Sequence, residues 1–173
     1  YVLLFLHGLN NCVSFNCNFL REVPKHGGSA LATDHVGSGK SPGVNQFTSV
    51  EEICEETRQL ILYARVLYGT RVPIFLMGHS LGALAALHFC LNHVTEVQML
   101  TGVIAHAPWL DTGKSLQPTP LLVSVVRAAA LIAPRVQIPT GLKIENSCYP
   151  EEYKRMALST GYAIMTITPF LFN

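Results

Sequence analysis

The residue best placed for chemistry is Ser80, at the centre of a Gly-His-Ser-Leu-Gly motif at residues 78–82. Branched apolar residues precede the motif at 72–77, and small and apolar residues follow it at 81–91 with helical spacing. This order predicts a strand, a sharp turn and a helix, with the serine at the apex. Glycines on either side allow the tight turn and leave the hydroxyl clear of the sheet. A serine held in this way is a candidate nucleophile.

A serine hydroxyl is a weak nucleophile until a base takes its proton, and the sequence offers no obvious base. The seven histidines all precede Asp111, at positions 7, 26, 35, 79, 88, 93 and 106. His88 and His93 lie too far along the predicted helix to reach Ser80. His106 with Asp111 is a local alternative for a base and its acid, and the same histidine is also typical of a packed core position.

The elements that must position Ser80 alternate along the chain. Apolar runs predict strands at residues 1–6, 29–33, 72–77 and 102–105, and the runs without alternation are typical of strands buried in a parallel sheet. Helices are predicted at residues 19–24 and 81–92, and residues 10–18 read as a loop. This alternation favours the α/β class, with helices flanking a parallel sheet.

A longer amphipathic helix is predicted between the second and third strands. Its N-cap is Thr48 or Ser49, its first turns are rich in glutamate, and Gly69 ends it. Its apolar face consists of Ile53, Leu60, Ile61, Ala64 and Leu67. The loop before it, which contains His35, ends in Gly-Lys-Ser and lacks the upstream glycine of a phosphate-binding P-loop.

The alternation stops after Asp111. An apolar helix is predicted at 119–132 with Arg127 as its only charge, followed by a link rich in proline and glycine and a charged helix at 150–158. Residues 161–173 give no clear pattern. We therefore expect a core at residues 1–112 and a helical region inserted over the sheet at 113–173.

Composition excludes several classes of protein. The net charge of the 173 residues is +1, without a cluster of lysine and arginine, so nucleic acid is not an expected partner. No apolar stretch reaches the length of a membrane span. The five cysteines form no C-x-x-C pair, which favours reduced thiols in an intracellular protein over a Cys12–Cys17 disulfide in a secreted one. No metal site is predicted.

Four segments, in this order, resemble the α/β-hydrolases of the serine aminopeptidase S33 and monoacylglycerol lipase type, also called lysophospholipase-like. They are L-H-G-L at 6–9, D-H-V-G-S-G-K-S at 34–41, G-H-S-L-G-A at 78–83 and H-A-P-W-L at 106–110. The second is close to the D-x-x-G-H-G-x-S loop of monoacylglycerol lipases, with Ser38 in place of histidine. The similarity extends over most of residues 1 to about 153. It implies a partial α/β-hydrolase fold, a mostly parallel sheet flanked by helices, with a helical cap that forms an acyl-chain pocket.

The resemblance also implies roles for matching residues. Ser80 would be the nucleophile, and the backbone N–H groups of Leu9 and Leu81 would form the oxyanion hole. The remaining motif positions are His7, Gly8, Gly78, His79 and Gly82. No cofactor is implied. The acid and the histidine of the family follow the cap, so we expect a chain truncated at both ends, or a decayed paralogue.

Several functions stay open at this point. The first is hydrolysis of carboxylic esters of lipid-like substrates through an acyl-enzyme at Ser80 in the complete protein. The apolar cap helix would then face an acyl chain, a membrane or a lipid droplet, and packing of this helix on the sheet is the alternative. The second is an inactive fragment or pseudoenzyme with a binding role or none, and the third is peptide cleavage. A cytoplasmic protein, or one peripheral to a membrane, is expected.

Overall fold

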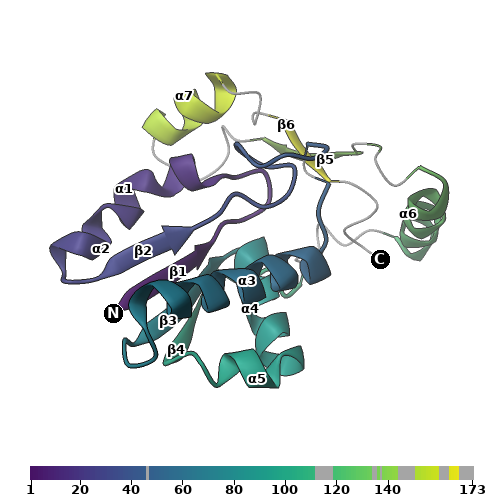
Figure 1. Cartoon of the computed structure of the whole chain (residues 1–173). Helices are drawn as coiled ribbons and strands as arrows, with labels where there is room; N and C mark the ends of the chain where they lie inside the picture. Colours follow the sequence, from purple (N-terminus) through teal and green to yellow (C-terminus); the bar gives the residue numbers. More distant parts are fainter. Residues whose placement is uncertain are drawn as a thin grey trace.

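The first 111 residues form a parallel sheet with helices packed against it. The computed structural model describes residues 1–45, 47–111, 119–133, 136, 138–143, 151–159 and 164–167. The strands are β1 (Val2–Leu6), β2 (Ser29–Ala32), β3 (Ile74–His79) and β4 (Gly102–His106), in the order β2-β1-β3-β4. All three pairings are parallel, so the predicted α/β class is confirmed (Figure 1).

The central strand β1 is buried along its whole length, as its uninterrupted apolar sequence predicts. Helices α3 (Val50–Tyr68) and α4 (Leu81–Asn92) pack against each other and cover one face of the sheet. The core between them contains Leu4, Leu6, Ile53, Ile61, Ile74, Leu76 and Phe89, all buried. This packing holds the carboxyl ends of β1 and β3 next to each other.

Helix α3 starts and stops where the sequence indicates. Ser49 is the N-cap, and its side chain accepts the N–H of Glu52 while the Glu52 carboxylate accepts the N–H of Ser49. Gly69 ends the helix with φ = 81°. The predicted apolar face is correct except for Leu67, whose side chain is 53% exposed because it lies on the solvent side of the helix.

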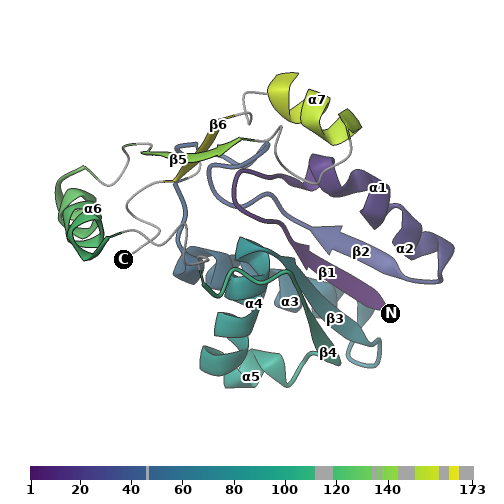
Figure 2. The same ribbon diagram turned by 180° about the vertical axis from the view of Figure 1, so that it is seen from behind.

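Two expectations about the sheet and its connections are wrong in part. The strand β4 was expected to be buried, yet Ile104 is 45% exposed, since β4 is the edge strand of the sheet and its outer side has no described neighbour (Figure 2). The segment expected to be a loop at 10–18 contains a 3-10 helix, η1 (Val13–Asn16), and the start of α1 (Cys17–Leu20). Helix α2 (Glu22–Lys25) and α5 (Val94–Val97) complete the helices of this part.

The later residues contain α6 (Pro120–Ile132), with Thr119 as its N-cap, and α7 (Glu151–Ser159). Strands β5 (Ile138–Lys143) and β6 (Ile164–Ile167) pair antiparallel, so part of the terminal segment that gave no sequence pattern is a strand. These elements are not part of the parallel sheet, and both figures show α7 beside α1 (Figures 1 and 2). No helix among the residues described has the length and hydrophobicity needed to cross a membrane.

The cysteines in the described residues are free thiols, so Cys12 and Cys17 are not joined to each other. Burial raises the pKa of the Cys54 thiol to about 11, and burial also raises the pKa of Cys90. These two thiols therefore stay protonated at neutral pH and are unsuited to nucleophilic chemistry.

Candidate active site

Ser80 occupies the turn between β3 and α4 in a strained backbone conformation. Its φ is 55° and its ψ is −114°, a combination that favours glycine and that a serine adopts only when the surroundings enforce it. The Ser80 N–H donates to the carbonyl of His106 at 3.0 Å, and its carbonyl accepts the N–H groups of Ala83 and Leu84 at 3.0 Å and of Trp109 at 3.2 Å. Backbone bonds from α4 and from the end of β4 thus fix the predicted turn.

The two glycines of the motif allow backbone segments to approach each other closely. A Cβ on Gly78 would lie 2.2 Å from the carbonyl oxygen of Gly82, and one on Gly82 would lie 2.3 Å from that of Leu6. These contacts are with backbone atoms, which cannot rotate away. The glycines therefore serve the packing of the turn against α4 and β1, as their spacing predicts.

The segment after β1 lies against the serine. A Cβ on Gly8 would be 3.2 Å from the Ser80 Cβ, so the backbone of this segment passes directly beside the turn. Within the described residues, neither the Leu9 N–H nor the Leu81 N–H donates a hydrogen bond. Leu81 is the first residue of the 12-residue helix α4, where the helix dipole favours negative charge. The structure places both expected oxyanion donors in segments that meet at Ser80.

His7 is a buried structural histidine in this arrangement. Its Nδ1–H donates to the Gly8 carbonyl at 2.9 Å, and its Nε2 accepts the backbone N–H of His35 at 3.0 Å. Burial, with a contribution from the charge of His35, holds the pKa of His7 well below its usual value. The neutral ring therefore fixes the backbone at Gly8, next to Leu9.

No histidine is hydrogen-bonded to the Ser80 hydroxyl in the described part of the chain, which includes all seven histidines. His79 and His106 instead face each other across β3 and β4, with their Nδ1 atoms 2.9 Å apart and their rings stacked. Burial and the neighbouring His106 lower the pKa of His79. His93 stacks on Phe89 at the far end of α4, away from the turn.

The loop after β2 is held by an aspartate. One Asp34 carboxylate oxygen accepts the N–H of Val13 at 2.6 Å, and the other accepts the N–H of Lys40 at 2.9 Å. The Ser41 hydroxyl donates to the Asp34 carbonyl at 2.5 Å. These bonds fold the Asp-His-Val-Gly segment beside the end of β1.

Sequence reasoning missed two participants in this region. His35, expected to be an ordinary loop residue, is 1% exposed, and Glu56, expected to be one of several acids in the first turns of α3, bonds to it at 2.6 Å. Spacing alone could not reveal this contact, since the residues come from a loop and a helix. The one available signal is the placement of Glu56 near the buried face of α3, beside the buried Thr57.

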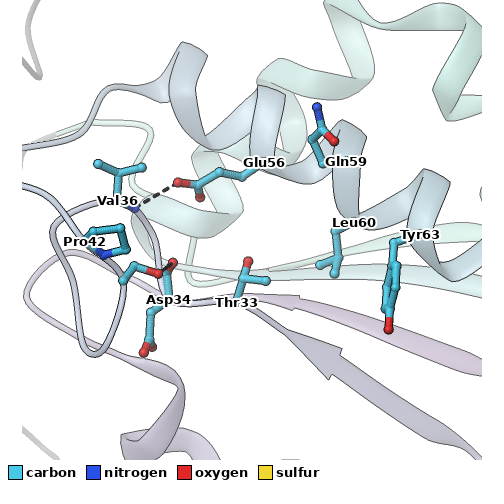
Figure 3. A pocket seen from close by; sticks show the side chains of 9 residues that line it. Thr33, Asp34, Val36, Pro42, Glu56, Gln59, Leu60 and Tyr63 are labelled. Atoms are coloured by element: carbon cyan, nitrogen blue, oxygen red, sulfur yellow. Dashed lines mark hydrogen bonds between the residues drawn. The ribbon is translucent and has the colours of Figure 1, made fainter.

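A pocket of about 440 Å³ lies between α3 and the loop that follows β2. Figure 3 shows Asp34, Val36 and Pro42 on one side and Glu56, Leu60 and Tyr63 on the other. No residue of the Ser80 turn lines this pocket, so it is separate from the candidate active site. No cluster of three or more potential metal ligands occurs among the residues described.

A parallel sheet with a strained serine at a strand-to-helix turn, and the end of the neighbouring strand packed beside that serine, defines an α/β-hydrolase. The profile of the family described as "Serine aminopeptidase, S33" matches residues 1–163. The chain belongs to this family of α/β-hydrolases.

Individual relatives agree with this assignment. The chain is 28% identical to the phospholipase YtpA of Bacillus subtilis over 125 residues, which are 68% of this chain and 46% of that protein. Its structure is similar to that of a monoacylglycerol lipase from Paleococcus ferrophilus, with a TM-score of 0.81 and 24% identity over 98% of this chain and 62% of the other. A monoglyceride lipase from Saccharomyces cerevisiae gives a TM-score of 0.77 and 18% identity, over 97% and 56%. The chain thus spans roughly half to three fifths of the length of these relatives.

Proposed function

We propose that this chain supplies the nucleophile and the oxyanion hole of a serine hydrolase that cleaves carboxylic esters of lipid-like substrates. The supporting observation is that the strained Ser80 lies between two chain neighbourhoods, Gly8–Leu9 and Leu81, whose Leu9 and Leu81 N–H groups have no acceptor among the described residues. Family membership and the relatives' names point to the same chemistry, of the monoacylglycerol lipase or lysophospholipase type.

In the proposed reaction, the Ser80 Oγ attacks the ester carbonyl carbon while a base takes its proton. The carbonyl oxygen gains negative charge, which the N–H groups of Leu9 and Leu81 stabilise, and each such donor contributes about 3 kcal/mol to transition-state stabilisation in related chemistry. The alcohol leaves with a proton and an acyl-Ser80 ester remains, which water then hydrolyses. We propose that the base that takes the Ser80 proton acts in the complete protein, because no histidine is hydrogen-bonded to the Ser80 hydroxyl among the described residues.

The exposed apolar residues of α6 support a lipid-like substrate or a lipid surface as a partner. Leu121, Leu131 and Ile132 are 75%, 82% and 86% exposed, and Val125 is also exposed. An acyl chain or a lipid surface would remove these side chains from water, at about 25 cal/mol per Å² of apolar area. The cap role of this region is part of the same proposal.

A second candidate is an inactive α/β-hydrolase with a binding role. Two observations favour it: His79 and His106 hydrogen-bond to each other, and no described histidine bonds to Ser80.

Labelling with a fluorophosphonate probe tests both candidates. We expect weak labelling of the chain at pH 7.5, and an increase when imidazole is added as an external base, because the nucleophile and the oxyanion hole are in place. Ser80→Ala is the control and should abolish labelling under both conditions. Labelling that stays absent with imidazole favours the inactive candidate, and strong labelling without imidazole would identify a local base, for which His106 is the first residue to replace.

A further inference from the structure

A chain of hydrogen bonds links the charged residue Glu56 on α3 to the segment that carries Leu9. The Glu56 carboxylate lies 2.6 Å from the Nδ1 of His35. It also accepts the backbone N–H of Val36 at 2.9 Å, as Figure 3 shows. On the opposite side of its ring, the Nε2 of His35 lies 3.2 Å from the carbonyl oxygen of His7. The backbone N–H of His35 donates to the Nε2 of His7. Two bonds therefore run from His35 to His7.

The partners of His35 determine how many protons its ring carries. The carbonyl oxygen of His7 only accepts hydrogen bonds, so the Nε2 of His35 must carry a hydrogen. An ionised Glu56 also only accepts, so the Nδ1 must then carry a hydrogen as well, and the geometry fits an imidazolium beside a carboxylate. A neutral ring has one N–H and could make only one of these two bonds to an ionised Glu56.

The surroundings of His35 make Glu56 its charged partner. Among the described residues, the titratable side chains that hydrogen-bond to His35 are His7, from the segment after β1, and Glu56, from α3. His7 is neutral in this arrangement, and the charge on His35 contributes to the lowering of its pKa. Asp34, the neighbour in the chain, uses its carboxylate oxygens for backbone N–H groups elsewhere. The His35 side chain is 1% exposed and that of Glu56 is 20% exposed, so water screens the pair only at its Glu56 end.

From these contacts we infer that Glu56 and a doubly protonated His35 act as positioning residues for the oxyanion hole. They fix the carbonyl and the ring of His7, which in turn holds the Gly8 carbonyl and the backbone that leads to the Leu9 N–H. Neither residue needs to touch the substrate for this. The inference rests on the proposed role of Leu9, and its geometric part can be tested separately.

The test uses the whole chain and compares Glu56→Gln with Glu55→Gln. The two carboxylate oxygens of Glu56 face the His35 Nδ1 and the Val36 N–H separately, whereas an amide has one acceptor oxygen and an NH2 group that only donates. If the amide oxygen of Glu56→Gln keeps the bond to Val36, its NH2 group can bond to the His35 Nδ1 only after that nitrogen has lost its hydrogen, so the variant removes the charged pair. Glu55 is a matched control on the same helix, because it carries the same charge but pairs with Arg58 at the surface.

Nuclear magnetic resonance of the 15N-labelled chain tests the hydrogen bonds from Glu56 through His35 to His7 without requiring activity. In the wild type at pH 7.5 we expect both ring nitrogens of His35 to be protonated. In Glu56→Gln we expect loss of one ring N–H signal of His35 and displacement of the Gly8 and Leu9 amide signals, whereas Glu55→Gln leaves them in place. A neutral His35 ring in the wild type, or unchanged Gly8 and Leu9 signals in Glu56→Gln, would overturn the inference. If Glu56→Gln does not fold, the wild-type spectrum still tests the charged pair, and a neutral His35 ring in that spectrum overturns the inference.

The effect on chemistry is measured by imidazole-assisted labelling of Ser80. Complete removal of one oxyanion donor costs about 100- to 1,000-fold in rate, so displacing the Leu9 donor should slow labelling by at least about tenfold in Glu56→Gln and leave Glu55→Gln unaffected. Displaced Leu9 signals together with unchanged labelling would refute the positioning role. If the wild type shows a doubly protonated His35 but is never labelled at Ser80, the proposed function is refuted, whereas the hydrogen bonds from Glu56 through His35 to His7 are confirmed.

Discussion

Replacing Ser80 with glycine should make the chain more stable, because the serine occupies a backbone conformation that only glycine adopts without strain. The φ of 55° and ψ of −114° place Ser80 outside the regions allowed to residues with a Cβ. Its hydroxyl makes no hydrogen bond to the rest of the described structure, so its removal leaves no buried partner unsatisfied. The comparison with Ser80→Ala separates the loss of the hydroxyl from the loss of the Cβ.

The expected gain follows from two opposing terms. A non-glycine residue in such a conformation costs about 1–3 kcal/mol of strain, which Ser80→Gly removes. Glycine makes the unfolded chain more flexible, which lowers stability by about 0.4–1 kcal/mol. The net change is a gain of about 1 kcal/mol relative to Ser80→Ala, equivalent to about 2–4 °C in Tm for a chain of this size.

Thermal unfolding followed by circular dichroism, with both variants in the same buffer, measures this difference. The order of Tm should be Ser80→Gly above Ser80→Ala, with the alanine variant close to the wild type. A glycine variant that is no more stable than the alanine variant would show that the turn is not strained. In that case the backbone conformation of Ser80 would not lower the stability of the chain, and no trade between stability and activity would be needed to explain it.

Two further perturbations test other parts of the site. Gly82→Ala should lower stability by about 3 kcal/mol, the upper range for overpacking, because its Cβ would lie 2.3 Å from the carbonyl oxygen of Leu6. Gly102→Ala is the control, since its Cβ would meet only the Phe75 ring, at 3.3 Å. Equal losses of Tm in the two variants would show that the close approach of Gly82 to β1 does not determine stability. The lowered pKa of His7 means that the unfolded chain binds more protons than the folded one, so stability should fall as pH decreases below about 6.5. Unfolding by urea between pH 7.5 and 5 should show a steeper loss in the wild type than in His7→Gln, and parallel slopes would count against the buried neutral ring.

The sequence was sufficient to predict the features that depend on residues close together in the chain. Gly78 indicated the turn because the atoms that crowd it, those of Gly82 and Ala83, belong to the same turn, and Ser49 indicated the start of α3 because its partner is three residues away. The unbroken apolar run at the N-terminus indicated the central strand. Each of these signals is a periodicity or a spacing within one element.

The sequence was insufficient where the outcome depends on which elements meet. The exposure of Ile104 follows from the edge position of β4, which strand order decides. The pairing of His35 with Glu56 joins residues 21 positions apart, and each is ordinary within its own segment. The bond between His79 and His106 likewise requires the register of β3 and β4.

The parallel register of the sheet also determines the order in which this site can assemble during folding. The unit β3-α4-β4, which contains Ser80, spans residues 74–106, whereas Val2 of β1 pairs with Ile74, far along the chain. Closing the longer loop costs more conformational entropy, so we expect the β3-α4-β4 unit to form before β1 docks onto it. The nucleophile would then acquire its conformation early, and the Gly8–Leu9 backbone would reach it only at the docking step. Substitutions in β1 should therefore slow completion of the site more than formation of the serine turn.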